Sequence, residues 1–212
     1  MSGSVITVDF ITGLLSGSFA LAIPLLLATL GEVFVERSGM LNMGIEGMIL
    51  LGCFASFLGA LYSGSAYVGL LVAVVLGVAI GLFMGLITLK MGANQAITGV
   101  VFNFFAIGLT GFFNRFILGV TLIPVKVHTL VKIAIPILSN IPIIGFLFNQ
   151  NALAYAAILM VPIANFILFR TNVGLKIRAV GGNALAADTM GIDVIKLRYA
   201  MWALGAALAG LA

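Results

Sequence analysis

The chain has 212 residues, of which 63% are hydrophobic and only 8% are charged, and its mean hydropathy is +1.30. A water-soluble globular domain is nearer half apolar and a quarter charged, so the composition excludes that class and indicates a chain solvated by lipid. The net charge of +4 does not indicate nucleic-acid binding, because the basic residues sit in short loops where they set membrane orientation. Cys53 and His128 are each the only residue of their type, so we expect no disulfide, no metal and no cofactor.

Apolar runs divide the chain. A membrane-spanning helix needs about 20 mostly apolar residues. The runs that meet this length are 10–34, 42–61, 66–90, a run that ends near 118, 152–169, and a run that begins near 195. We therefore expect an all-α, polytopic bundle of about six membrane helices, forming one domain over residues 1–212.

The two ends of the chain each allow a prediction about the membrane helices. No basic residue precedes Arg37, so we expect the first apolar run to remain as a membrane helix rather than to be cleaved as a signal peptide. The last run is still apolar at Ala212, so we expect further helices in the full protein.

The hydrophilic stretch 170–199 sets the orientation. It carries half of the basic residues, which by the positive-inside rule makes it cytoplasmic. Counting spans backwards puts Lys90 and Arg37 inside as well, and puts the N-terminus and the loop 119–151 outside. Within that loop the apolar piece 141–148 is too short to span, so we expect a short interfacial or re-entrant segment there.

The segment 38–47 places a carboxylate, an amide and three glycines between two apolar runs. Glycine weakens a helix, and an ionisable residue in membrane-embedded sequence usually faces a bundle interior or a wet cavity. One interpretation is a broken helix at membrane depth that lines a solute path, as in many transporters. The other is a cytoplasmic turn with Glu46 in the first turn of the next helix. Glu46 itself could line the path or cap its helix by accepting backbone N–H bonds.

A second polar segment, 92–99, precedes the fourth run. A neutral solute needs hydrogen-bond partners and a wet path rather than a charge-matched site. The polar side chains that we predict to line such a path are Asn42, Glu46, Asn94, Gln95 and Asn103.

Three glycines in the third run, Gly77, Gly81 and Gly85, recur every fourth residue and therefore share one helix face. In a membrane such a face lets a neighbouring backbone approach closely, so we predict a tight helix contact there.

The cytoplasmic stretch contains a short predicted helix over 184–190. We expect a turn at 181–183, with Asn183 as N-cap, and Gly191 as the C′ residue of a Schellman end. Asp193 can cap the next helix. A helix this short is only marginally stable in water by itself, so we expect it to pack against something else. It is either a docking site for a soluble partner or a linker at the membrane surface.

Four segments resemble, in the same order, elements of one permease family. Residues 41–47 read Leu-Asn-Met-Gly-Ile-Glu-Gly, and with 31–48 they resemble the first signature of ABC-transporter permeases for branched-chain amino acids, simple sugars and nucleosides. This form is most similar to the nucleoside-type branch. Residues 93–99 and 203–212 resemble two further elements, and 174–192 resembles the segment that contacts the ATPase. Gly182-Asn183 departs from the family pattern, where an acidic residue and Asn are frequent.

The resemblance implies the membrane subunit of an ATP-driven importer in the cell membrane. It implies three kinds of partner: two cytoplasmic ATP-binding subunits, a second permease chain (identical or paralogous), and an external substrate-binding lipoprotein. It also implies an ATPase-coupling loop at 171–193. The coupling residues that it implies are Gly181, Asn183, Leu185, Ala186, Thr189, Met190 and Gly191.

The chain contains no Gly-x-x-x-x-Gly-Lys-Ser/Thr phosphate loop, so we do not expect it to hydrolyse ATP or to be an enzyme. We expect a pathway for a small neutral solute, nucleosides first and simple sugars next. Two other classes stay open. One is a self-powered secondary transporter that uses Glu46 as its ion-coupling carboxylate. The other is a structural membrane subunit without a pathway.

Overall fold

The computed structural model describes residues 8–119, 126–127, 129–134 and 145–212. The long helices are α1 (Val8–Arg37), α2 (Ile45–Ser63), α3 (Ala66–Gly85), α4 (Gln95–Leu118), α5 (Ala152–Arg170) and α8 (Val194–Leu211). α3 continues through a π-helical turn, η1 (Leu86–Lys90). All six, with η1 counted in α3, are long and apolar enough to cross a membrane, which confirms the predicted polytopic bundle.

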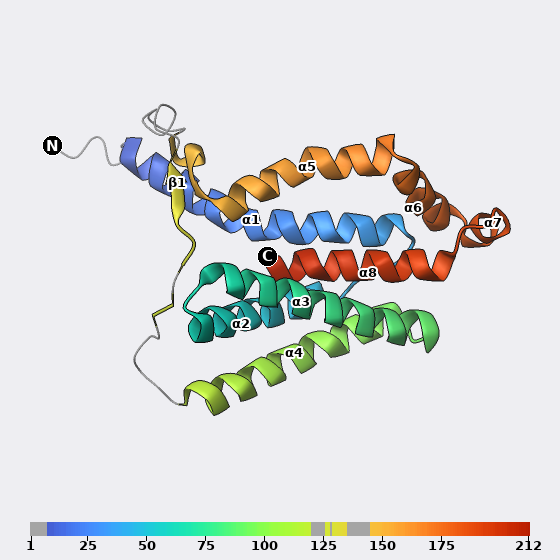
Figure 1. Cartoon of the computed structure of the whole chain (residues 1–212), viewed down its shortest axis with the longest axis horizontal. Coiled ribbons are helices and arrows are strands. Elements are labelled where there is room, and N and C mark those ends of the chain that lie inside the picture. Colours follow the sequence, from blue (N-terminus) through green and yellow to red (C-terminus); the bar gives the residue numbers. More distant parts are fainter. Residues whose placement is uncertain (1–7, 120–125, 128, 135–144) are drawn as a thin grey trace.

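α8 is the central helix of the bundle. It runs between α1 on one side and α2 and α3 on the other, while α5 and α4 lie at the two outer edges (Figure 1). Trp202, on α8, is the largest fully buried side chain, in a core cluster with Val35 of α1 and Met48 of α2. The helices that precede α8 therefore pack around it.

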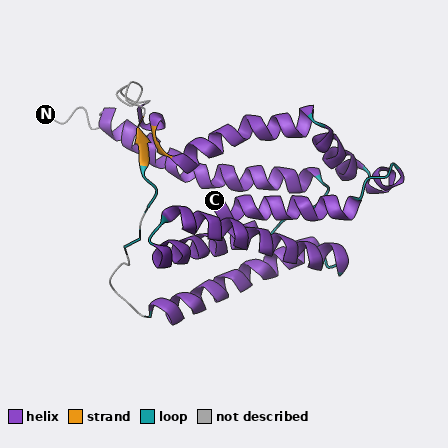
Figure 2. Ribbon diagram, in the orientation of Figure 1, coloured by secondary structure: helices purple, strands orange, loops and turns teal. Residues whose placement is uncertain are grey.

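Glycines make the close contacts with α8. A Cβ added at Gly77 or Gly81 of α3 would collide with the backbone of Ala206 or Trp202, and one at Gly85 would meet the ring of Tyr199. The predicted tight face is confirmed, and its partner is α8. Gly52 of α2 and Gly31 of α1 approach α8 in the same way, so glycines on three helices let α8 pack closely against them. Figure 2 shows these helices alongside α8, in the orientation of Figure 1.

Two short helices cross the end of the bundle. α6 (Asn172–Gly182) and α7 (Ala184–Thr189) connect α5 to α8 (Figure 1). The sequence analysis did not predict α6. It predicted a turn at 181–183, which is wrong for Gly181 and Gly182 because they form the last two residues of α6. Thr171 caps this helix by accepting from the Gly174 N–H, and Ile177 and Val180 are buried on its inner face.

The opposite end carries a small irregular region. Strand β1 (Lys132–Ala134) pairs antiparallel with β2 (Asn149–Asn151). A 3-10 turn, η2 (Gly145–Phe148), directly precedes β2. The interpretation of 119–151 as a loop did not include these strands. Of the predicted interfacial piece 141–148, residues 141–144 lie outside the described residues. The rest is η2, in which the Phe146 ring meets Phe19 of α1 edge-on at 5.8 Å.

Candidate functional site

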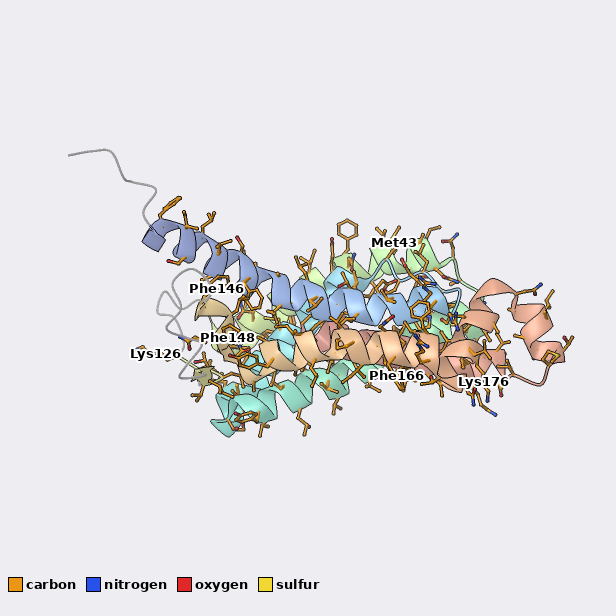
Figure 3. The ribbon with its side chains drawn as sticks, turned by 90° about the horizontal axis from the view of Figure 1, so that it is seen from above. Met43, Lys126, Phe146, Phe148, Phe166 and Lys176 are labelled. Atoms are coloured by element: carbon orange, nitrogen blue, oxygen red, sulfur yellow. The ribbon has the colours of Figure 1, made fainter. Side chains whose placement is uncertain are left out.

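The polar segment that follows α1 lies at the same end of the bundle as α6. Gly39 has a φ of +79°, and a Cβ there would lie 3.2 Å from the Cα of Gly181. Met43 and Lys176 lie toward one end of the molecule, with Phe146 toward the other (Figure 3). The structure therefore places residues 38–44 in the connection between α1 and α2, at the end that carries α6 and α7.

Asn42 organises this connection from inside. Its side chain is buried, and its Oδ1 accepts from the Gly44 N–H at 3.1 Å. Its own N–H donates to Oε1 of Glu32, one turn before the end of α1, at 3.2 Å. The amide side chain closes a local turn while the α1 carboxylate holds the turn against the helix that precedes it.

The first half of α4 supplies the other contacts. Oε1 of Gln95 accepts from the Leu41 N–H at 2.7 Å. Asn103 uses both ends of its amide: Oδ1 accepts from the Gly47 N–H at 2.8 Å, and Nδ2 donates to the Met43 carbonyl at 3.0 Å. α4 therefore holds residues 41–47 through three hydrogen bonds, two to the connection and one to the start of α2.

The two polar segments of the sequence thus meet in space. Asn42, Gln95 and Asn103 come together around residues 41–47. Asn94 does not join them, because its exposed side chain caps α4 by accepting from the Ala96 and Ile97 N–H groups. All four amides hold backbone groups in this structure, and lining a solute path stays a prediction for each of them.

Glu46 is exposed at the start of α2. The suggested capping of α2 by Glu46 is not seen in this structure, where no side-chain hydrogen bond caps α2 and the Gly47 N–H donates to Asn103 of α4. The sequence does contain a signal for the contact between Asn103 and Gly47, because Asn103 is a polar amide within an apolar run. The sequence does not indicate which backbone group this amide binds. An ion-coupling site needs a carboxylate enclosed by protein, and the exposure of Glu46 speaks against that role.

A cavity of about 680 Å³, which we call the outer cavity, lies in the half of the bundle away from α6 and α7. Its walls come from α1, α2, α3, β2 and the last residues of α8. Polar groups in its lining include Ser16, Ser56, Asn149 and Gln150, and the exposed Cys53 lies beside them. The sequence analysis named none of these residues, because isolated small polar side chains in apolar helices resemble ordinary packing residues.

The short helix α7 has two well-defined ends. Asn183 Oδ1 accepts from the Ala186 N–H at 3.1 Å. At the other end Gly191 has a φ of +81°, its N–H donates to the Asp188 carbonyl at 2.9 Å, and the Ile192 N–H donates to the Ala187 carbonyl at 3.1 Å. This is the predicted Schellman pair of bonds, so both predicted ends of α7 are confirmed.

α7 presents its apolar side chains to the outside. Leu185 is 81% exposed and Met190 is 82% exposed, while Ala187 is buried beneath them. Asp193 caps α8 by accepting from the Lys196 N–H at 2.9 Å, as predicted. Only a few residues separate the two helices, so α7 is fixed directly to the N-terminus of the central helix.

The family described as "Branched-chain amino acid transport system / permease component" matches residues 14–212. The chain belongs to this permease family. The match includes all of the polar connection, α4 and α7, and the six membrane-length helices agree with a multi-pass membrane protein.

Named relatives extend the comparison. The chain is 36% identical to a guanosine ABC transporter permease protein of Bacillus subtilis, over 96% of this chain and 65% of that one. It is 36% identical to the "Putative glucose ABC transporter permease protein" of Haloferax volcanii, over 96% and 62%. It is 33% identical to a nucleoside ABC transporter permease protein of Lactococcus lactis, over 89% and 62%. The chain thus spans less than two thirds of the length of these relatives, and no solved structure matches it.

Proposed function

We propose that this chain is the permease subunit of an ATP-driven importer in the cell membrane, and that it forms part of the pathway for a nucleoside. The observation that carries the proposal is family membership over 14–212, together with relatives named for guanosine and for nucleosides. A sugar is the second solute class, since another relative is named for glucose.

The partners follow from the same proposal. Separate cytoplasmic ATP-binding subunits would supply the energy, a second permease chain would complete the pathway, and an external lipoprotein would deliver the solute. Within the coupling loop 171–193, α7 is the element suited to receive an ATPase subunit, because Leu185 and Met190 stand exposed on a helix with two fixed ends. Methionine is one of the residue types that are enriched at protein interfaces.

The mechanism then uses the packing of α8. ATP-driven closure of the ATPase subunits would displace α7, and the displacement would pass to α8 through the short connection that Asp193 closes. Because Gly52, Gly77 and Gly81 hold α8 in direct backbone contact, α2 and α3 would have to shift with it. Such a shift would change the relative position of the outer cavity and the polar connection, which both border α2.

The docking step can be tested directly. We expect the double substitution L185D/M190D to abolish co-purification of the ATPase subunit while leaving membrane insertion intact, since charged side chains would replace both apolar anchors. The matched control is Y62D/Y67D, two exposed residues at the turn between α2 and α3, at the other end of the bundle. If the ATPase co-purifies with L185D/M190D at wild-type yield, the docking assignment is wrong.

A further inference from the structure

Two arginines share one aromatic ring where α1, α5 and α6 meet. Cζ of Arg178 in α6 lies 5.1 Å from the centroid of the Phe169 ring, and Cζ of Arg37, in the last turn of α1, lies 5.6 Å from it. Both distances are within the range of a cation–π contact. Two guanidinium groups from two different helices therefore contact one ring of α5.

No acid neutralises this pair in the part of the chain that the structure describes. The ion pair found there joins Lys196 to Asp193 and involves neither arginine. Nε of Arg178 is buried without a hydrogen-bond partner. Arg170 is the last residue of α5 and Lys176 lies on α6, so basic residues outnumber the one neighbouring acid, Glu36 of α1, where these helices end. Two guanidinium groups on one ring, neither in an ion pair among the described residues, point to an anionic ligand.

The side chains around Arg37 and Arg178 indicate which kind of anion would bind there. Phe166, on α5, is 60% exposed, and Phe169 and Leu175 are also exposed. Figure 3 shows Phe166 on the span of α5 and Lys176 beyond the end of that helix. The arginines therefore lie at the end of a membrane-length helix, next to exposed apolar side chains of that helix. This arrangement matches a ligand with an anionic head and an apolar tail.

We propose that Arg37 and Arg178, stacked on Phe169, bind the phosphate group of an anionic phospholipid whose acyl chain lies along Phe166. A guanidinium presents a rigid fork that matches phosphate oxygens, and stacking on the ring fixes the fork in advance. Basic pockets between membrane helices on the cytoplasmic side are suited to anionic lipid headgroups. The site does not depend on the proposed transport function, because it needs only a membrane-embedded chain.

Native mass spectrometry of the full permease in detergent tests the site with three probes: phosphatidylglycerol, phosphatidylcholine with the same acyl chains, and inorganic phosphate. We expect phosphatidylglycerol to bind more tightly than phosphatidylcholine, and phosphate alone to neither bind nor displace it. R37Q and R178Q should each weaken phosphatidylglycerol binding about five-fold, from the value of one basic residue near an anionic lipid surface. R115Q removes an exposed cation near the far end of α4 and should change nothing.

R37Q is the decisive variant, because Arg37 is exposed and its loss leaves no buried gap, whereas Arg178 is half-buried. Circular dichroism of each variant checks that the bundle is intact. The proposal is overturned if R37Q binds phosphatidylglycerol as tightly as R115Q does. It is also overturned if inorganic phosphate competes as well as the lipid does, which would indicate a site for a free anion.

Discussion

Replacing Asn103 by leucine should loosen the contact between α4 and the start of α2. The substitution removes both hydrogen bonds of the amide, one to the Gly47 N–H of α2 and one to the Met43 carbonyl in the connection. Gly47 is buried, and a buried polar group left unsatisfied costs about 1–3 kcal/mol, although single interhelical hydrogen bonds in membrane proteins average nearer 0.6 kcal/mol. Met43 is 48% exposed, so loss of the bond to its carbonyl should add little. We therefore expect N103L to lower the free energy of unfolding by about 1–3 kcal/mol.

The control for this prediction is T98V on the same helix. The Thr98 hydroxyl donates to the Asn94 carbonyl within α4, at 2.8 Å, so its removal breaks no contact between helices. We expect T98V to change the free energy of unfolding by no more than about 0.5 kcal/mol. Equilibrium unfolding in mixed micelles can be followed by the fluorescence of Trp202, the single tryptophan, which is buried in the core. If N103L unfolds with the same midpoint as T98V, Asn103 does not tie α4 to α2.

Three further outcomes follow from the structure. G81A should destabilise the bundle by about 1–3 kcal/mol because its methyl group meets the α8 backbone, whereas G108A, which has open space, should be neutral or stabilising in the same assay. A membrane-impermeant maleimide added from outside should label Cys53 in the outer cavity, and excess nucleoside should slow the labelling; equal rates with and without nucleoside would separate that cavity from the pathway. The Lys196 N–H, and next the Lys196 side chain, lower the pKa of the Asp193 carboxyl, so the cap should persist at the ordinary aspartate pKa of about 3.9 and be lost only as the pH falls through the lowered value. Hydrogen exchange of the Lys196 amide reports this, and D193A should expose that amide already at neutral pH.

Local chemistry explains which parts of the fold could be predicted. Asn183 and Gly191 define the ends of α7 through bonds to neighbouring residues, so the sequence contains all that is needed. The glycine face of α3 was also predictable as a close contact. Its partner was not, because a row of glycines specifies a flat surface but not which helix fills it. That choice depends on how all the helices pack at once.

The sequence could not specify the contacts of the polar residues. Asn103 and Gly47 are far apart along the chain, and nothing local indicates that the amide caps a different helix. Glu46, the most conspicuous polar residue of the sequence, is exposed instead. α6 was missed because Gly181 and Gly182 look like a turn, whereas the absence of a side chain at Gly181 admits the Arg37 carbonyl. In each case the deciding partner lies on another helix.

Uptake of a radiolabelled nucleoside into proteoliposomes tests the central claim most directly. The vesicles would hold the full permease, its ATP-binding subunits and the binding lipoprotein, with wild-type α7 or with L185D/M190D. The account predicts uptake that requires ATP and the ATP-binding subunits, and its loss in L185D/M190D. Uptake driven by an ion gradient without the ATP-binding subunits, or full ATP-driven uptake by L185D/M190D, would contradict it.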